Sequence, residues 1–489
     1  MKKFIQSPSI FLFLLPAFFV FHGFVEYFPA VSVADASYLL LLYAGVTAAL
    51  WGLAWLFYRN ARKAAIFSFS AMAFHFFFGA FHDLLKKYFD NSFFTRYSVL
   101  LPLFLMIFVL LFIWLKRTKH TLSRVSLYLN LLMLIFLLSD AARLLQSSAR
   151  REQPAGSVPL IHCDTCTKPD IYLLLFDEYS SSKSLRENWN FDNSGLDSFL
   201  VQSGFRIQSD ARSNYNMTQF SVAALLNMDY VPLANPDSVT IYDYTRCYEL
   251  IRKNRVCEML ETVGYRILNY SIFDLKNNPS RVAEDFLPLR TKLITSQTFL
   301  SRVRRDLFYH LVVGKFRIPG LASKFIYITG RSNRRNLEAT LAESRRVDQQ
   351  PRFVYTHIKM PHPPYYYDGE QEQTDLRKLI QESASRDVEP YLRYIPRTNQ
   401  VVQELVRSIQ KNAGRPVVIL FLSDHGFRVD DKKSTSNFDV QSAVYASHHS
   451  LDRYYANISG VNHFRVLFTE LFRTPQPLLR DSTSFLTDK

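Results

Sequence analysis

Long apolar stretches dominate the N-terminal part of the chain and give way to a mixed apolar and polar pattern near residue 145. Each stretch has about the length that an α-helix needs to cross a membrane, and charged or helix-breaking residues separate them. They cover residues 10–27, 38–57, 64–84, 97–115 and 127–144. The pattern predicts a five-span transmembrane domain over residues 1–146.

Lys and Arg cluster before the first stretch and in the loops after the second and fourth, which places these segments in the cytoplasm. The loop with Lys86, Lys87 and Arg96 is a mild exception. An odd number of spans then carries the rest of the chain out of the cytoplasm. We therefore predict a bacterial cytoplasmic (inner) membrane protein whose large domain is periplasmic or extracellular. Cleavage of the first stretch as a signal peptide is the alternative, with the same orientation.

After residue 145, short apolar runs alternate with segments whose apolar residues recur at helical spacing. Residues 147–168 are polar and indicate a linker, residues 169–475 form the predicted catalytic domain, and residues 476–489 form a tail. Strands are expected at 170–176, 266–270, 352–357, 417–422, 442–445 and 464–468, and helices at 196–203, 218–228, 245–263, 337–347 and 391–412. This alternation predicts an α/β fold with a mostly parallel sheet and helices on both faces.

Ionisable residues stand at two of the predicted strand ends. Asp177 and Glu178 follow the first strand, and Asp424 and His425 follow the strand at 417–422. Two carboxylates are costly to bury unless a cation compensates them, although these two also suit the cap of a following helix. Carboxylate and imidazole together are suitable ligands for Zn²⁺ or Mn²⁺. Open α/β sheets bind ligands at this edge, so the pattern favours a metal site.

A hydroxyl and two imidazoles add candidate chemistry. Thr218 opens an apolar helix, where positive potential and free N–H groups suit a nucleophile that carries a phosphoryl group. The alternative is that Thr218 or Asn216 only caps that helix. His357 and His362 lie in a proline-rich segment after another predicted strand, which indicates a polar loop at the same edge.

The net charge and the cysteine content bear on the binding partners and the compartment of the protein. The formal net charge of +15 raises the question of nucleic acid, but a location outside the cytoplasm argues against that partner. Four cysteines fit an oxidising compartment. Cys163 with Cys166, and Cys247 with Cys257, are candidate disulfide pairs. Half of a zinc site is the alternative for the C-x-x-C.

On the order of these motifs, the chain resembles the alkaline-phosphatase/sulfatase superfamily over residues 168–472. It looks most like the membrane-anchored branch, which includes lipoteichoic acid synthases and phosphoethanolamine transferases. The resemblance implies an α/β/α sandwich that holds one divalent metal, Zn or Mn. It implies metal ligation by Asp177, Glu178, Thr218, Asp424 and His425. It also implies that Thr218 is the nucleophile, that His362 is a catalytic residue on the substrate side, and that His357 and Asn216 help to bind substrate.

Two departures from the family pattern shape the functional prediction. The closest string to the C/S-x-P-x-R motif of sulfatases runs from Asn277 to Arg281 and has Asn at the position that must become formylglycine. No third His follows Gly426 closely, which puts a second metal site in doubt. We predict transfer of a phospholipid headgroup to an envelope glycan or lipid through phospho-threonine. A phosphodiester or phosphate ester hydrolase is the alternative, and an inactive envelope scaffold a third reading.

Overall fold

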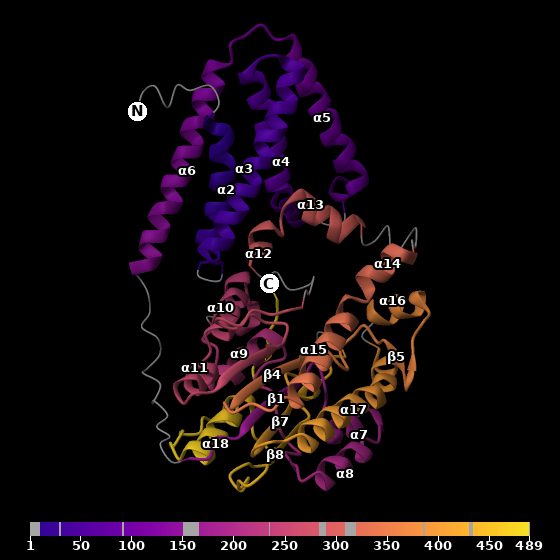
Figure 1. Ribbon diagram of the computed structural model, residues 1–489. Coiled ribbons are helices and arrows are strands. Elements are labelled where there is room, and N and C mark those ends of the chain that lie inside the picture. Colours follow the sequence, from indigo (N-terminus) through magenta and orange to yellow (C-terminus); the bar gives the residue numbers. More distant parts are fainter. Residues whose placement is uncertain are drawn as a thin grey trace. The chain divides into compact units, whose positions relative to one another are not determined.

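The computed structural model describes residues 10–28, 31–89, 92–149, 166–233, 235–282, 290–308, 319–384, 387–429 and 434–488 (Figure 1). The chain divides into two compact units. The helical unit comprises Met1–Ala155 and Phe286–Arg317, and the α/β unit comprises Gly156–Asp285 and Ile318–Lys489. The linker predicted at 147–168 lies mostly outside the described residues.

The helical unit contains the predicted apolar stretches as helices. They are α2 (Ile10–Glu26), α3 (Val33–Tyr58), α4 (Ala61–Tyr88), α5 (Tyr97–Arg117) and α6 (Ser123–Ala149), with the short η1 (Phe93–Thr95) before α5. Within the described residues four of them, α3 to α6, are long and apolar enough to cross a membrane. The remaining helix, α2, is apolar but has 17 residues, at the lower end of the spanning range. Large apolar side chains such as Leu41 and Leu105 are exposed on these helices, as expected of surfaces that face lipid.

A segment from the middle of the sequence belongs to the helical unit. It forms α12 (Thr291–Thr295), α13 (Phe299–Arg302) and η3 (Val303–Phe308). The N–H of Gly79 in α4 donates to the carbonyl of Gln297 at 2.9 Å, and a Cβ at Gly79 would lie 2.3 Å from that oxygen. The nearly buried Arg302 contacts Asp83 of α4. The sequence pattern had placed this segment within one continuous domain over 169–475.

The α/β unit is built on a six-stranded sheet. Its strands are β1 (Asp170–Phe176), β2 (Arg206–Ile207), β3 (Arg266–Tyr270), β4 (Arg352–Ile358), β7 (Val417–Ser423) and β8 (Ser442–Ala446). The order is β2-β8-β7-β1-β4-β3; β3, β4, β1 and β7 are mutually parallel, while β8 runs antiparallel to β7 and β2. All residues of the three central strands β1, β4 and β7 are buried, as helices on both faces require. The predicted, mostly parallel α/β fold is confirmed.

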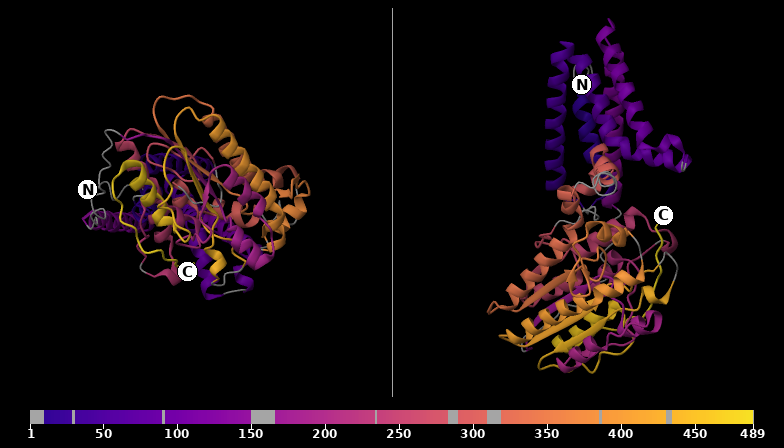
Figure 2. Two further views of the ribbon diagram at one scale, coloured as in Figure 1. Left: turned by 90° about the horizontal axis from the view of Figure 1, so that it is seen from below. Right: turned by 90° about the vertical axis from the view of Figure 1, so that its right-hand side faces the viewer.

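Helices flank the sheet (Figures 1 and 2). They are α7 (Ser182–Trp189), α8 (Ser194–Gln202), α9 (Thr218–Asn227), α10 (Ile241–Arg252), α11 (Arg255–Thr262), α14 (Pro319–Ile326), α15 (Ile328–Ser344), α16 (Leu376–Ala384), α17 (Val388–Lys411) and α18 (Gly460–Phe472), with 3₁₀ turns η2 (Pro236–Ser238) and η5 (Thr435–Asn437) and a two-stranded hairpin of β5 (Tyr367–Asp368) and β6 (Gln371–Glu372). Helix α15 packs on β3, β4 and α17, whereas α9 packs against α10, α11 and α18.

Two predicted elements differ from the structure. The strand expected at 464–468 is wrong, because these residues lie within α18. Phe464, Phe468 and Phe472 recur every four residues and are buried on one helical face, a period that so short a run does not reveal. The single helix expected at 245–263 is two helices. The first ends at Arg252, and Asn254 caps the second, because its side chain accepts a hydrogen bond from the Cys257 N–H at 2.8 Å.

Candidate metal centre

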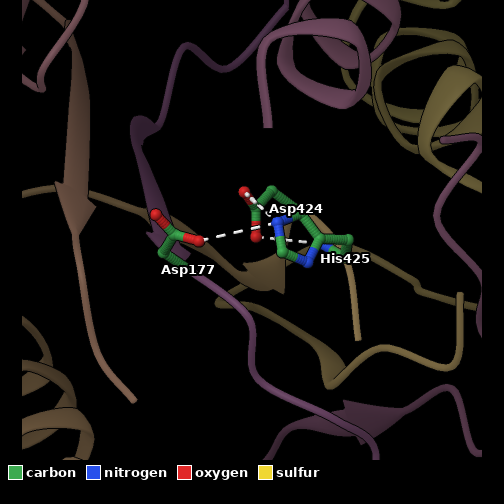
Figure 3. Close-up of side chains that lie close together, drawn as sticks. All are labelled: Asp177, Asp424 and His425. Atoms are coloured by element: carbon green, nitrogen blue, oxygen red, sulfur yellow. Dashed lines mark hydrogen bonds and ion pairs between the residues drawn. The ribbon is translucent and has the colours of Figure 1, made fainter. Parts of the chain in front are cut away.

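Two neighbouring parallel strands deliver the acidic groups. Asp177 follows β1 and Asp424 follows β7, and the paired strands bring both residues to one edge of the sheet. The Asp177 N–H donates to the Ile358 carbonyl at 3.0 Å, which also fixes this residue to the end of β4. Both side chains are buried. Together with His425 they form a cluster in which one ligand atom from each residue lies within 4.8 Å of the others (Figure 3).

The backbone orients the His425 ring. Its Nδ1 lies 2.9 Å from the Gly426 carbonyl, an acceptor, so Nδ1 carries the proton and Nε2 presents its lone pair. Nε2 lies 3.7 Å from Asp177 Oδ1 and 3.6 Å from Asp424 Oδ2. Gly426 makes this position possible, because a Cβ there would lie 2.0 Å from the Ser436 carbonyl oxygen. The Asp-His-Gly run therefore needs glycine for a close backbone approach.

The two carboxylates each leave one oxygen free. Asp424 Oδ1 accepts the N–H groups of Glu178 at 3.0 Å and His425 at 2.8 Å. Asp424 Oδ2 and Asp177 Oδ1 are buried and have no hydrogen-bond partner among the described residues. Burial raises the pKa of Asp424 to about 6, and burial together with the Asp424 charge raises the pKa of Asp177. Two buried carboxylates with free oxygens are costly unless a cation compensates them, which favours a bound metal ion.

A divalent metal fits this cluster. Ligand atoms bound at about 2.0–2.2 Å from a zinc ion lie roughly 3–4 Å apart, close to the separations from His425 Nε2. Burial lowers the pKa of His425, so its imidazole is neutral, as a metal ligand must be. Asp177, Asp424 and His425 are the residues that would hold the ion, and carboxylate with imidazole suits Zn²⁺ or Mn²⁺.

Thr218 stands beside the cluster. It is the first residue of α9, preceded by the extended Met217. Its Oγ1 lies 3.3 Å from His425 Nε2, the atom that presents the lone pair, and it also interacts with Asp424. At this helix terminus free backbone N–H groups point toward negative charge. The structure places the Thr218 hydroxyl against the candidate ligands.

Glu178 contacts a guanidinium and an imidazole outside the three-residue cluster. Its Oε1 accepts from the N–H and Nε of Arg428, at 3.2 and 3.3 Å, and its Oε2 lies 4.0 Å from His362 Nε2. Burial opposes ionisation of Glu178, but the Arg428 guanidinium lowers its pKa below the usual value. Glu178 therefore has its own cation in the protein. It is absent from the described three-residue cluster, although the resemblance had suggested that it binds metal.

The two histidines of the proline-rich segment lie at different depths. His357, on β4, is fully buried; its Nε2 has no hydrogen-bond partner among the described residues and lies 3.9 Å from Asp177 Oδ2. The His362 side chain is about 25% exposed, and its Nδ1 lies 2.6 Å from the Pro363 carbonyl, so its Nε2 accepts protons. Partial burial and the nearby Lys359 ammonium lower its pKa. His362 is thus neutral at physiological pH.

Asn216 has a structural partner. Its amide donates to the Leu486 carbonyl at 3.1 Å and accepts the Leu486 N–H at 2.7 Å, which ties the C-terminal segment to the α/β unit. The substrate-binding role of Asn216 stays a prediction. Arg428 and Lys359 were missed, although both are basic residues within three positions of a candidate His in the sequence.

The cysteines differ from the prediction. Cys247 and Cys257 are free thiols, so the predicted bond between them is wrong. Both are buried, on α10 and at the start of α11, and act as small apolar side chains of the core. Cys166 is disulfide-bonded, and Cys163 lies outside the described residues.

The comparisons with known proteins agree with this arrangement. The family model described as Sulfatase matches residues 196–458, more than half of the chain. The chain belongs to the Sulfatase family. The predicted superfamily is therefore confirmed, and the family match includes Thr218, His362, Asp424 and His425 but begins after Asp177. A comparison with curated proteins finds no match by sequence.

Solved structures with a similar fold include three bacterial proteins. Lipooligosaccharide phosphoethanolamine transferase A from Neisseria meningitidis is 11% identical, with 95% of each chain covered and a TM-score of 0.39. The C-terminal periplasmic domain of EptC from Escherichia coli is 11% identical over 65% of this chain and 86% of that one, with a TM-score of 0.39. A putative sulfatase from Bacteroides thetaiotaomicron is 13% identical, covering 65% and 73%, with a TM-score of 0.40. Likenesses at this level say nothing about substrate.

Proposed function

We propose that this membrane protein transfers a phospho-headgroup from a phospholipid to an envelope glycan or lipid, with Thr218 as the nucleophile. The observation that carries this proposal is the identity of the residue at the start of α9. A threonine stands there against the candidate ligands, and threonine cannot be converted to formylglycine. The chemistry that sulfate-ester hydrolysis by that route needs is therefore missing at this position, whereas a hydroxyl suits phosphoryl transfer.

Side chains of this protein are assigned to each step of the transfer. Thr218 Oγ1 attacks the phosphorus of the donor phosphodiester, and the bond to the lipid alcohol breaks, which leaves the headgroup phosphate on Thr218. The acceptor hydroxyl then attacks the same phosphorus and restores the Thr218 hydroxyl. His362 Nε2 is the group that the structure offers to take the proton of the attacking hydroxyl and to pass it to the departing oxygen, which is that of the lipid alcohol in the first step and that of Thr218 in the second. A bound divalent metal would lower the pKa of the Thr218 hydroxyl and polarise a phosphoryl oxygen.

The setting supports a lipid donor. The α/β unit is carried by a chain with four helices of spanning length and a shorter apolar helix, so a membrane substrate is at hand. The distribution of Lys and Arg favours a periplasmic or extracellular location for the α/β unit. Phospholipid headgroups of the outer leaflet, of the phosphoethanolamine or phosphoglycerol type, are then the simplest donors. No nucleic acid takes part.

Mass spectrometry of the peptide that contains Thr218 tests the proposal. Full-length protein incubated with isotopically labelled phospholipid is expected to carry a phospho-headgroup adduct on Thr218, and the mass of the adduct names the group. Thr218→Ala should remove the label. Ser221→Ala is the matched control, because Ser221 lies one turn along α9 and its hydroxyl donates to the Tyr215 carbonyl at 2.8 Å. Labelling that persists in Thr218→Ala would refute the assignment. Release of free headgroup in the presence of glycan would favour the hydrolase instead.

A further inference from the structure

A cavity of about 300 Å³ lies in the α/β unit beside the end of β4. Ile358 and Met360, on either side of Lys359, form part of its wall. Asn333 of α15 also lines it, and the Asn333 amide bonds both the N–H and the carbonyl of Lys359, at 2.8 and 2.9 Å. The cavity wall is therefore fixed to the strand that carries His357. A ligand held there lies next to the sheet edge that holds the candidate metal cluster.

Three arginines give the cavity its charge. Arg331 and Arg334 come from α15 and Arg397 from α17. Among the described residues none of the three forms an ion pair with a carboxylate, although Glu372 also lines the cavity. The Arg397 guanidinium lies 4.9 Å from the centre of the Tyr367 ring and donates to Gln400 Oε1 at 2.9 Å, while its Nε is buried without a partner. Arg331 donates to the Lys324 carbonyl at 2.7 Å, so the cavity offers three positive charges and, at Arg397 Nε, a buried donor without a partner.

Tyrosine rings supply the other half of the lining. Tyr327 stacks on Tyr366 with ring centres 5.6 Å apart, and Tyr367 stacks on Tyr394 at 6.3 Å. All four line the cavity. Ring faces pack well against the C–H face of a sugar, whereas guanidinium groups bind phosphate oxygens in pairs. The volume is at the lower end of the range for small-molecule sites and far exceeds what one phosphate ion fills.

We infer that this cavity binds a phosphorylated sugar of the acceptor glycan. The word acceptor rests on the proposed function; the binding of a sugar phosphate does not. Phosphate oxygens pair with Arg334 and Arg397, and the sugar ring lies on the tyrosines. A hydroxyl elsewhere on the same glycan is then held near the sheet edge, where the sequence and structure place Thr218. The cavity would select anionic glycans as acceptors.

Isothermal titration calorimetry tests this inference with full-length Thr218→Ala protein in detergent, so that no turnover occurs. The probes are glucose 6-phosphate, glucose, inorganic phosphate and glycerophosphoethanolamine, the last a soluble form of a donor headgroup. Glucose 6-phosphate is expected to bind best, and Arg334→Gln/Arg397→Gln should weaken it at least about 10-fold, since hydrogen bonds to charged groups are lost. Arg335→Gln is the control: Arg335 neighbours Arg334 on α15 and is exposed like it, but it does not line the cavity and bonds the Arg281 carbonyl instead. The thermal midpoints of the variants report on folding.

Several results would overturn the inference. The inference fails if glucose 6-phosphate does not bind at about 10 mM, or if Arg334→Gln/Arg397→Gln leaves its binding unchanged. Equal binding of inorganic phosphate would contradict a role for the sugar, and tighter binding of glycerophosphoethanolamine would assign the cavity to the donor. None of these depends on catalysis. If wild-type protein forms no adduct on Thr218 with labelled phospholipid, but glucose 6-phosphate still binds, the proposed function is refuted and the cavity assignment stands.

Discussion

Asp177 and Glu178 are adjacent in the sequence and both buried, yet their surroundings are opposite. Glu178 meets the Arg428 guanidinium, and its pKa is lowered. Asp177 meets a second carboxylate, two imidazoles and the charge of Lys359, and burial raises its pKa in spite of the Lys359 ammonium. Glu178 is paired with a guanidinium, whereas Asp177, among the described residues, has only imidazoles within ion-pair distance, and we propose that it takes a cation from solution. The two environments distinguish an ion-paired carboxylate from a candidate metal ligand, where the sequence shows only two adjacent acids.

The largest expected effect follows removal of a ligand oxygen. Asp177→Asn and Asp424→Asn should each lower transfer activity by more than about 100-fold, because direct ligands matter more than the groups that orient them. Glu178→Gln should lower it by only about 10-fold, through the loss of a partner for His362. Activity is measured as transfer of labelled headgroup by purified protein. Equal losses of transfer activity in Glu178→Gln and Asp177→Asn would contradict the different roles assigned to the two carboxylates.

The next effect concerns His357. Its unpartnered Nε2 faces Asp177 at 3.9 Å, so His357→Ala should weaken metal affinity about 10–100-fold. Tyr355→Phe is the matched control, because it removes only the hydroxyl that lies 3.3 Å from His357 Nδ1. A metal titration of both variants decides the matter. A smaller loss in His357→Ala than in Tyr355→Phe would show that His357 serves the core alone.

Glu178→Gln should affect stability more clearly than chemistry. The substitution leaves the Arg428 guanidinium, about 22% exposed, without its carboxylate. We expect the free energy of unfolding of the α/β unit to fall by about 2 kcal/mol. Arg428→Gln added to Glu178→Gln should restore part of that loss, which urea unfolding measures. Full stability in the single variant would show that the pair contributes nothing.

The smallest expected effect is the change with pH in how much a bound metal stabilises the protein. With its pKa raised to about 6, Asp424 in the metal-free folded chain holds a proton that the unfolded chain has already released between about pH 4 and 6. Stability of the metal-free protein therefore falls as pH rises through that window. A metal displaces the proton, so Zn²⁺ or Mn²⁺ should raise the thermal midpoint more at pH 7.5 than at pH 5, by about 2 °C. Equal shifts at both pH values would contradict a protonated carboxylate.

Much of this arrangement follows from local sequence. The fully apolar runs of β1, β4 and β7 predict buried parallel strands, and the ends of such strands predict where Asp177 and Asp424 meet. What a side chain faces is not local. Packing between distant segments decides these contacts. It pairs Glu178 with Arg428 and Asn216 with Leu486, and it leaves Cys247 and Cys257 as free thiols. The docking of Thr291–Phe308 on α4 depends on the absence of a side chain at Gly79.

Metal content of the purified protein tests the central claim most directly. Inductively coupled plasma mass spectrometry should find a single Zn or Mn ion per chain in the wild type and in Glu178→Gln, and almost none in Asp177→Asn or Asp424→Asn. Retention of the ion in both aspartate variants, or its loss in Glu178→Gln alone, would contradict the assignment of Asp177, Asp424 and His425 as the ligands.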